Sequence, residues 1–531
     1  MLVISLRFDS LNSSMSFYEQ FELGLGNISI PLPVEHPFVY LVAAFLFGVA
    51  LCSLGNDRKG NLPLVNPGQL LDVSDQKRIT EFKKNSIELL LKGKALYPNQ
   101  PFRIFTPGGE MVSVPANLID EVRSHPDVTF PNKGSPLSRY RGFEPFGNNK
   151  NLPHMINKYI TRILGKLTGA LSEEAGLALN KTFLDDPEWR EIVPIQSILP
   201  VVTQVSTRVF MGEEGCRDDR WLQASGAYAE VAFHTVAELQ SWPKFLRPYV
   251  HWYMPSCNTL RARLDDARNA IQVHIDQRNV MKAAAIAKGE PLPKFEDALE
   301  WAAIEDPNHD PAILQILLSL VAIHTTTDLL TEVMMRIAQN PEIVTALREE
   351  VIQVLKAEGL KKTALYELKL MDSVVKEAQR MKPILLTPMR RSVTQDFKLS
   401  NGTVIRKGQM VVTDSTHMWD SEYYEDPDKF DGYRFLRMRQ VPGKENQGQL
   451  VSTSAEHLGF GHGQFACPGR FFAANEIKVL LCHLLLKYEW KLAPGPDPKA
   501  TCNGFFMVGD QSTKFLIRRR KEELDLASLA A

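Results

Sequence analysis

Neither sign of charge predominates in this chain. Its 531 residues include 61 Lys and Arg against 62 Asp and Glu. Proteins that bind nucleic acid through its phosphates carry a clear basic excess, so we predict no nucleic-acid partner. The sequence also lacks any repeat of 20 to 50 residues and any long low-complexity tract, which excludes solenoid and linker-rich architectures.

Cysteine is scarce and scattered. The chain has six, without paired spacing, at positions 52, 216, 257, 467, 482 and 502. This distribution excludes a disulfide framework, and no Cys-x-x-Cys or Cys/His zinc pattern is present. We therefore expect a reducing compartment around the main domain.

One uncharged apolar run, residues 38–54, precedes everything else of interest. Its length is at the short end of the roughly 17–25 residues of a spanning helix, so we predict a transmembrane anchor; a buried core helix is the alternative. Arg58 and Lys59 follow the run, which predicts that the C-terminal part is cytosolic. The tail 1–37 would then be lumenal, and Asn12 and Asn27 are glycosylation sequons or accidents of sequence.

The rest divides into a Pro-rich hinge, 55–70, and a main domain, 71–531. Helical periodicity predominates from about 72 to 95 and from 150 to 360. Alternating residues flank the turn at 107–109, and another hairpin is centred on Asn401-Gly402. These patterns predict a mainly α domain with a small β region.

Cys467 lies in a Gly-rich loop, 460–469, directly before a helical pattern from Arg470 to Leu486. A thiol at the start of a helix lies near a positive dipole end and near backbone N–H groups, and both favour the thiolate. Glycines allow the backbone to approach a flat, bulky group, and haem iron with an axial Cys fits a single thiolate. The alternative is a small buried hydrophobe in a turn.

The pattern Phe460-x-x-Gly463-x-x-x-Cys467-x-Gly469 resembles the haem-binding loop of the cytochrome P-450 monooxygenases. The resemblance implies haem b as cofactor, Cys467 as the axial ligand of its iron, and cofactor contacts from Phe460, Gly463 and Gly469. The family usually has Arg or His two residues before the cysteine, at the haem propionate. This chain has Phe465 there, so another cation must contact the propionate.

Four polar residues, 324–327, interrupt the apolar run 311–335. Threonine hydroxyls in a helix can bond carbonyls four residues back, which needs no function. Compared with the family's oxygen-activation helix, Thr325 takes the threonine position and His324 the position of an acid. The resemblance therefore implies that Thr325 holds water near dioxygen and that His324 relays protons, although its charge differs from that of a carboxylate.

Glu377 and Arg380 are three residues apart and share a helix face. An exposed ion pair of this kind would contribute little. The family instead has a buried Glu-x-x-Arg pair beneath the haem loop, joined by a later Arg. The region around Arg434 resembles that later segment, which implies a three-residue structural network.

Other roles follow from the resemblance alone. Arg162 would pair with a propionate, unless it is an exposed surface residue, and Arg390 or Arg391 would meet a propionate from another segment. The substrate pocket would include apolar residues of two segments far apart in the sequence, namely Ile384, Leu385, Leu386, Phe505 and Phe506.

The resemblance covers nearly all of residues 70–520. It implies the cytochrome P-450 fold behind a single N-terminal transmembrane helix, in the endoplasmic reticulum membrane. It also implies a monooxygenase that uses O2 and electrons from a membrane NADPH–cytochrome P-450 reductase on a small lipophilic substrate. The cysteine loop and the His-Thr-Thr helix resemble filamentous-fungal ent-kaurene-oxidase-like members, which suggests a terpenoid or related polycyclic secondary metabolite.

Two alternatives stay open. The atypical His324 leaves room for a haem-thiolate isomerase or dehydratase that needs no reductase. A non-enzymatic membrane haem-binding protein is the other.

Overall fold

The computed structural model describes residues 21–25, 28–32, 62–68, 75–131, 136–147, 149 and 151–529. The chain divides into two compact units, 1–61 and 62–531. In the first unit, β1 (Phe21–Leu25) and β2 (Ile28–Leu32) form an antiparallel hairpin. The predicted anchor 38–54, both sequons and most of the predicted hinge lie outside the described residues.

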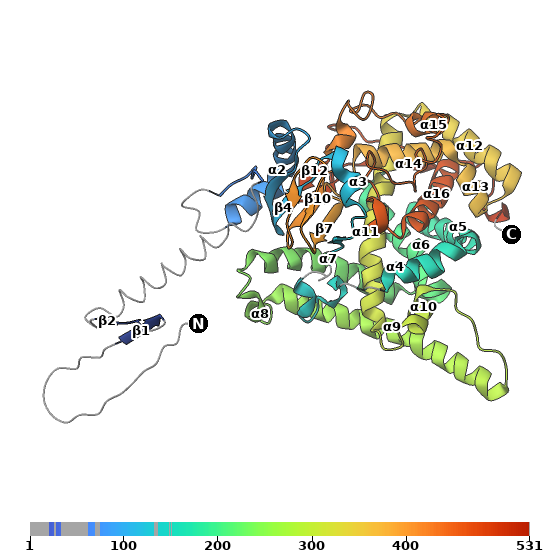
Figure 1. Ribbon diagram of the computed structural model, residues 1–531. Helices are drawn as coiled ribbons and strands as arrows, with labels where there is room; N and C mark the ends of the chain where they lie inside the picture. Colours follow the sequence, from blue (N-terminus) through green and yellow to red (C-terminus); the bar gives the residue numbers. More distant parts are fainter. Residues whose placement is uncertain are drawn as a thin grey trace. The chain divides into compact units, whose positions relative to one another are not determined.

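The second unit is mainly helical, as predicted (Figure 1). Its α-helices are α2 (Gln76–Leu96), α3 (Ile119–Val122), α4 (Leu152–Met155), α5 (Thr161–Phe183), α6 (Pro194–Cys216), α7 (Asp219–Ser241), α8 (Arg247–Val250), α9 (Pro255–Lys288), α10 (Ala298–Glu305), α11 (Pro311–Gln339), α12 (Ile343–Glu358), α13 (Lys362–Glu367), α14 (Lys369–Met381), α15 (Arg434–Met438) and α16 (Arg470–Lys487).

The strands of this unit form small sheets. The largest has the order β3 (Phe102–Thr106), β4 (Gly109–Ser113), β10 (Met410–Thr413), β7 (Met389–Val393), β5 (Val128–Thr129). Only its β4–β10 pair is parallel. A second, antiparallel sheet has the order β11 (Tyr488–Leu492), β14 (Phe515–Arg519), β6 (Arg190–Ile192). Two hairpins complete the β structure, β8 (Phe397–Lys398) with β9 (Val404–Ile405), and β12 (Thr501–Asn503) with β13 (Phe506–Val508).

Both hairpins expected from the sequence are present. β3 and β4 pair around the turn at 107–108, and β8 and β9 flank Asn401-Gly402. Residues 62–68, which we assigned to the hinge, pack on this sheet: the Val65 N–H donates to the Arg103 carbonyl at 3.0 Å, and Val65 is buried. The second unit therefore begins inside the predicted hinge.

α11 is the longest apolar helix of the unit. Asp310 caps it by accepting from the N–H groups of Ala312 and Ile313 at 2.9 and 3.2 Å, and Pro311 occupies its first position. Within the described part of the chain it alone is long and apolar enough to cross a bilayer, yet most of its apolar stretch is buried inside the unit. Its sequence is that of a core helix.

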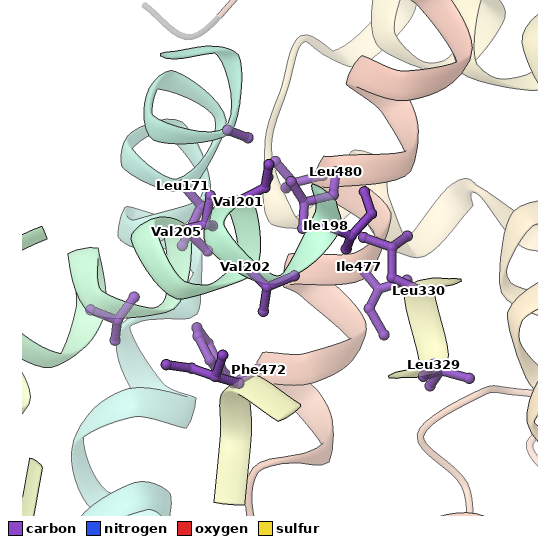
Figure 2. Close-up of a cluster of buried hydrophobic side chains, with 14 of the residues drawn as sticks. Leu171, Ile198, Val201, Val202, Val205, Leu329, Leu330, Phe472, Ile477 and Leu480 are labelled. Carbon is purple, nitrogen blue, oxygen red and sulfur yellow. The ribbon is translucent and has the colours of Figure 1, made fainter. Parts of the chain in front are cut away.

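The core holds α11 and α16 in fixed relation. Leu171 of α5, Val202 of α6, Leu330 of α11 and Ile477 of α16 are fully buried and belong to one cluster (Figure 2). Each such side chain contributes about 1.5–3 kcal/mol by leaving water. The helix that contains Thr325 and the helix that follows Cys467 are thus anchored in the same packed centre.

Candidate active site

The loop around Cys467 is held by its own backbone. The Cys467 N–H donates to the Phe460 carbonyl at 2.8 Å, and the Ala466 N–H donates to the Gly463 carbonyl at 3.0 Å. At the start of α16, Arg470 Nη1 donates to the Cys467 carbonyl at 2.9 Å. Because these bonds fix both sides of the cysteine, its half-buried sulfur has a defined position.

The two glycines predicted to contact a cofactor differ in whether their positions would accept a side chain. Gly463 has φ +81°, and a Cβ there would lie 2.5 Å from the Arg123 carbonyl oxygen. The close approach that demands glycine at 463 is therefore to the protein's own backbone at the end of α3. At Gly469 a Cβ would lie 4.0 Å from the Cys467 sulfur, an ordinary contact. Cofactor contacts at Gly463 and Gly469 stay predictions.

The loop does not by itself favour a thiolate, contrary to our expectation. Burial raises the pKa of Cys467, and the opposing effect of the Gly469 and Arg470 N–H groups and the Arg470 charge is smaller. The sequence argument counted the helix dipole and the donors but left out the cost of removing the sulfur from water. A cation bound directly to sulfur would supply the missing stabilisation, as a metal ion does for its thiolate ligands.

Glu377, Arg380 and Arg434 come together in one buried cluster. Arg380 makes two bonds to the Glu377 carboxylate, at 2.8 and 2.9 Å, and Arg434 Nε lies 3.1 and 3.2 Å from the same two oxygens. Glu377 and Arg380 are fully buried. Arg380 also donates to the Met418 carbonyl at 2.7 Å, and Arg434 to the Glu425 carbonyl at 2.6 Å. The pair is therefore not the exposed one that the sequence left open.

Glu476 on α16 is a second buried carboxyl, and it predicts a pH effect. Ser206 donates to its Oε1 at 2.6 Å, while Oε2 has no partner among the described residues, and burial raises the pKa of Glu476 to about 8. The folded state therefore binds an extra proton between the unfolded pKa near 4.5 and about 8, so stability falls as pH rises through that window and levels off above it.

We expect Glu476→Gln to remove this loss. At pH 8 the variant should exceed the wild type by up to roughly 4 kcal/mol in unfolding free energy, at about 1.4 kcal/mol per pKa unit. Urea unfolding at several pH values checks this, with Glu358→Gln, an exposed position at the end of α12, as control. Parallel stability–pH curves for the wild type and Glu476→Gln would contradict the assignment.

Arg390 and Arg391 are adjacent on β7 and occupy opposite faces of the strand, since side chains alternate. The Arg391 guanidinium lies 4.9 Å from the centre of the Phe465 ring in the cysteine loop, and that of Arg390 lies 5.0 Å from the Phe505 ring. Arg391 is buried, and burial lowers its pKa to about 10. Burial also lowers the pKa of Arg390.

Neither arginine has a carboxylate partner within the described residues. Among the described residues, Arg391 donates only to the carbonyls of Arg390 and His462, at 2.9 and 3.5 Å, and its buried Nε has no partner there. A buried unpaired charge is costly unless an anion completes the site. A haem propionate is such an anion, and Cys467 is a suitable iron ligand. The residues present therefore fit a haem held by the sulfur and by Arg391.

This fit predicts that removing the Arg391 charge stabilises the protein without haem but weakens its hold on haem. Arg391→Gln should melt at a higher temperature than the wild type when both lack haem, because a buried unpaired charge is removed. Its haem should dissociate roughly 10- to 100-fold faster, the loss of one charge-assisted contact. Haem transfer to an excess of acceptor apoprotein measures this, with Arg390→Gln on the other face of β7 as the matched control. Equal rates for the two variants would exclude Arg391 as the specific contact.

Thr325 and His324 lie in the middle of α11. The Thr325 hydroxyl donates to the carbonyls of Val321 and Ala322 at 2.8 and 3.3 Å, the local bonding that needs no function. The residue is nevertheless exposed, as is Val321 at 48%. His324 packs edge-to-face on Phe233 at 5.8 Å, and burial lowers its pKa. The catalytic roles of Thr325 and His324 stay predictions.

Two segments predicted to line a substrate pocket lie side by side. The Leu386 N–H donates to the Phe505 carbonyl at 2.8 Å, and the Met507 N–H to the Ile384 carbonyl at 3.0 Å. Ile384, Leu385 and Phe505 are partly exposed, and Phe506 is 48% exposed.

Leu386 differs from the other four candidates. It is fully buried in a core cluster with Phe82 and Phe102, and its contact with substrate stays a prediction. Its side chain packs with residues of α2 and β3.

Arg162 is exposed on α5 and has no ion pair within the described residues. Its contact with a propionate stays a prediction, beside the alternative of an ordinary surface residue. Sequence reasoning missed Asp328 and Lys382, which form a buried ion pair at 2.6 Å. A signal existed for one of them: Asp328 is the only acidic residue from 311 to 331.

A helical unit with a fixed cysteine loop and a buried arginine beside it is the arrangement expected of a haem-thiolate protein. A family model described as Cytochrome P450 matches residues 157–517. Cytochrome P450 monooxygenase eqxH of Fusarium heterosporum is 48% identical over 479 residues, covering 89% of this chain and 93% of that protein. Cytochrome P450 monooxygenase adrA of Penicillium rubens is 37% identical over 508 residues, covering 93% and 99%.

The fold agrees. The solved structure titled "Retinoic acid bound cyanobacterial CYP120A1" matches with a TM-score of 0.62 at 20% identity, over 83% of this chain and 96% of that chain. The chain belongs to the cytochrome P450 family. It is a monooxygenase, an oxidoreductase with a haem cofactor that uses O2, a redox partner and a small-molecule substrate.

Proposed function

We propose that this protein hydroxylates, or successively oxidises, C–H bonds of a lipophilic fungal secondary metabolite, a terpenoid or related polycyclic compound. Electrons come from a membrane NADPH–cytochrome P450 reductase, and the cofactor is haem b. The observation that carries the proposal is the paired strip formed by 384–386 and 505–507. It brings exposed apolar side chains together beside Arg390, which contacts Phe505.

The character of that strip supports a lipophilic substrate. Ile384, Leu385, Phe505 and Phe506 offer no charged group, so recognition depends on apolar contact and shape. Similarity to monooxygenases of Fusarium and Penicillium species supports a fungal metabolite.

Each residue of the site has a distinct task. The bound haem supplies activation of O2 for attack on an unactivated C–H bond. Cys467 holds it through sulfur, and Arg391 neutralises a propionate. The Glu377 cluster keeps the loop in place, while the Thr325 hydroxyl holds water on the exposed face of α11 and passes protons onward.

Reconstitution tests this function. Membranes that contain the full chain and an NADPH–cytochrome P450 reductase are incubated with a panel of terpenoid scaffolds under oxygen-18 gas. We expect NADPH-dependent products that gain one labelled oxygen atom per hydroxylation. Turnover without NADPH, or products without label, would instead indicate the isomerase or dehydratase that His324 left open. Haem binding with no product from a broad panel would overturn the terpenoid class.

We further propose that the protein is anchored in the endoplasmic reticulum membrane by residues 38–54, with the catalytic unit in the cytosol. A second feature supports membrane contact. The connection between α7 and α9 exposes a group of large aromatic side chains, with Tyr253 at 85%; the others are Trp242, Phe245, Tyr249 and Trp252. Aromatic side chains of this kind are enriched at membrane–water interfaces.

Two measurements test the anchor. Microsomal protein should resist carbonate extraction, and deletion of 38–54 should release it. If the tail is lumenal, Asn12 or Asn27 receives glycan, and glycosidase treatment shifts the mobility of the wild type but not of a double Asn→Gln variant. Full release of the intact chain by carbonate would exclude the anchor.

A further inference from the structure

A small, partly open hollow of about 40 Å³ lies beside the C-terminal half of α11. The helix contributes Asp328, Thr331 and Glu332 to its wall. Lys382, just after α14, and the loop around Asp510 form other parts of it. This hollow contains none of the residues predicted from the sequence to bind haem or substrate.

An ion pair forms the inner part of the wall. Lys382 Nζ lies 2.7 and 2.6 Å from the two carboxylate oxygens of Asp328. Lys382 is only 2% exposed and Asp328 15%, so the carboxylate alone keeps some contact with solvent. Burial raises the pKa of Asp328, Glu332 raises it further, and Lys382 opposes both. Glu332 itself is paired with Arg336 at 2.7 Å.

The helix places this carboxylate on the same face as Thr325. At about 100° and 1.5 Å per residue, Asp328 lies roughly 60° around α11 and 4.5 Å along it from Thr325. Val321 and Thr325, the exposed residues in the middle of the helix, continue that face away from the hollow. In the other direction Glu332 lies about 20° around the helix from Thr325 and two turns further along, and it lines the hollow. Its neighbour Thr331 has a buried hydroxyl with no partner among the described residues.

The geometry points to Asp328 as the carboxyl through which protons pass from this hollow to Thr325. A hydronium ion that enters the hollow from solvent gives a proton to an Asp328 oxygen and becomes water. That carboxyl passes a proton, through water, to the Thr325 hydroxyl oxygen, which releases its own proton to the next water. Asp328 then returns to a carboxylate beside the Lys382 ammonium. Only O–H bonds form and break, and the electrons for O2 reduction come from the redox partner.

Position supports this route over one through His324. The His324 ring packs edge-to-face against Phe233, and burial lowers the pKa of His324. Asp328 is the only acidic residue on α11 before Glu332, and it lines the hollow one helical turn from Thr325. Glu332 also lines the hollow, but it is two turns from Thr325 and its carboxylate is paired with Arg336. Lys382 acts as a positioning residue, since its ammonium group holds both oxygens of the Asp328 carboxylate.

The competing role is structural, because the pair also ties α11 to the segment that begins at Pro383. Two variants separate the roles. Asp328→Asn leaves Lys382 buried and unpaired, so it loses both functions. Asp328→Asn combined with Lys382→Met removes both charges, so no unpaired charge stays buried, while the carboxyl group is still absent. Asp328→Glu keeps an acid, and Asp510→Asn changes a carboxyl elsewhere on the wall of the same hollow.

The holoenzyme with reductase and NADPH, without added substrate, provides the readout, so the result does not depend on the terpenoid proposal. Oxygen consumption is measured in ordinary and heavy water, together with the thermal midpoint and the carbon-monoxide difference spectrum. We expect Asp328→Asn and the double variant to consume oxygen roughly 10²-fold more slowly, with a larger solvent isotope effect. Asp328→Glu should retain most of the rate, and Asp510→Asn all of it.

The double variant decides the question. If it melts like the wild type and shows the wild-type carbon-monoxide spectrum while oxygen consumption stays slow, the carboxyl has a proton-transfer role. If the double variant recovers both oxygen consumption and stability, the Asp328–Lys382 pair has only a structural role. A wild-type rate for Asp328→Asn would overturn the proposal as well.

Discussion

Cys467→Ala should abolish turnover and remove the long-wavelength Soret band that thiolate-bound haem gives in its reduced carbon-monoxide complex. The sulfur is the only thiol in the 460–469 loop, and no neighbouring His or Cys in that loop could replace it without rebuilding its backbone bonds. Since burial raises the pKa of the free thiol, we also expect the wild type without haem to react slowly with thiol reagents at pH 7.

Cys502→Ala is the matched control. Cys502 is also half-buried, but it contacts Ser86 rather than the loop, and burial raises its thiol pKa too. We expect this variant to retain the spectrum and at least about half of the wild-type activity, since a surface-near substitution changes stability little. Equal spectra for the two variants would remove Cys467 as the ligand and, with it, the basis of the monooxygenase site.

The features that could be predicted from the sequence are those whose residues lie close together along the chain. The Cys467 loop spans ten residues, Glu377 and Arg380 share one helical turn, and both hairpins have local turn residues. Helical periodicity indicated a mainly α domain, and the order of these motifs resembled that of the cytochrome P-450 family, which implied the particular fold. None of this required knowledge of which distant segments meet.

What could not be predicted depends on tertiary packing. Gly463 is required by Arg123, some 340 positions earlier, and Leu386 is a core residue because Phe82 and Phe102 surround it. We expected a lowered pKa for the Cys467 thiol, but burial raises it, and burial depends on the whole fold. Arg390 and Arg391 could not be separated in the sequence, and only their partners on opposite faces of β7 distinguish them.

Glu377→Gln should have the largest effect on stability. The carboxylate is fully buried between two guanidinium groups, with four nitrogen–oxygen contacts between 2.8 and 3.2 Å. Its removal leaves Arg380 and Arg434 without an anion, and breaking a buried pair in this way costs about 3–5 kcal/mol. That is a large part of the roughly 5–15 kcal/mol by which proteins are stable. We therefore expect little soluble protein at growth temperature.

The same Glu→Gln substitution at an exposed ion pair serves as the control for the stability loss expected at Glu377. Glu367 pairs with Lys369 at 2.8 Å, but both side chains are well exposed, so Glu367→Gln should cost less than about 1 kcal/mol. Protein made at low temperature allows urea unfolding and haem content to be compared for both variants. Because Arg434 and Arg380 also hold the carbonyls of Glu425 and Met418, the loss at Glu377 should spread to the segment before the cysteine loop and lower haem retention. Two variants that unfold at the same urea concentration would show that the buried cluster contributes no more than a surface pair.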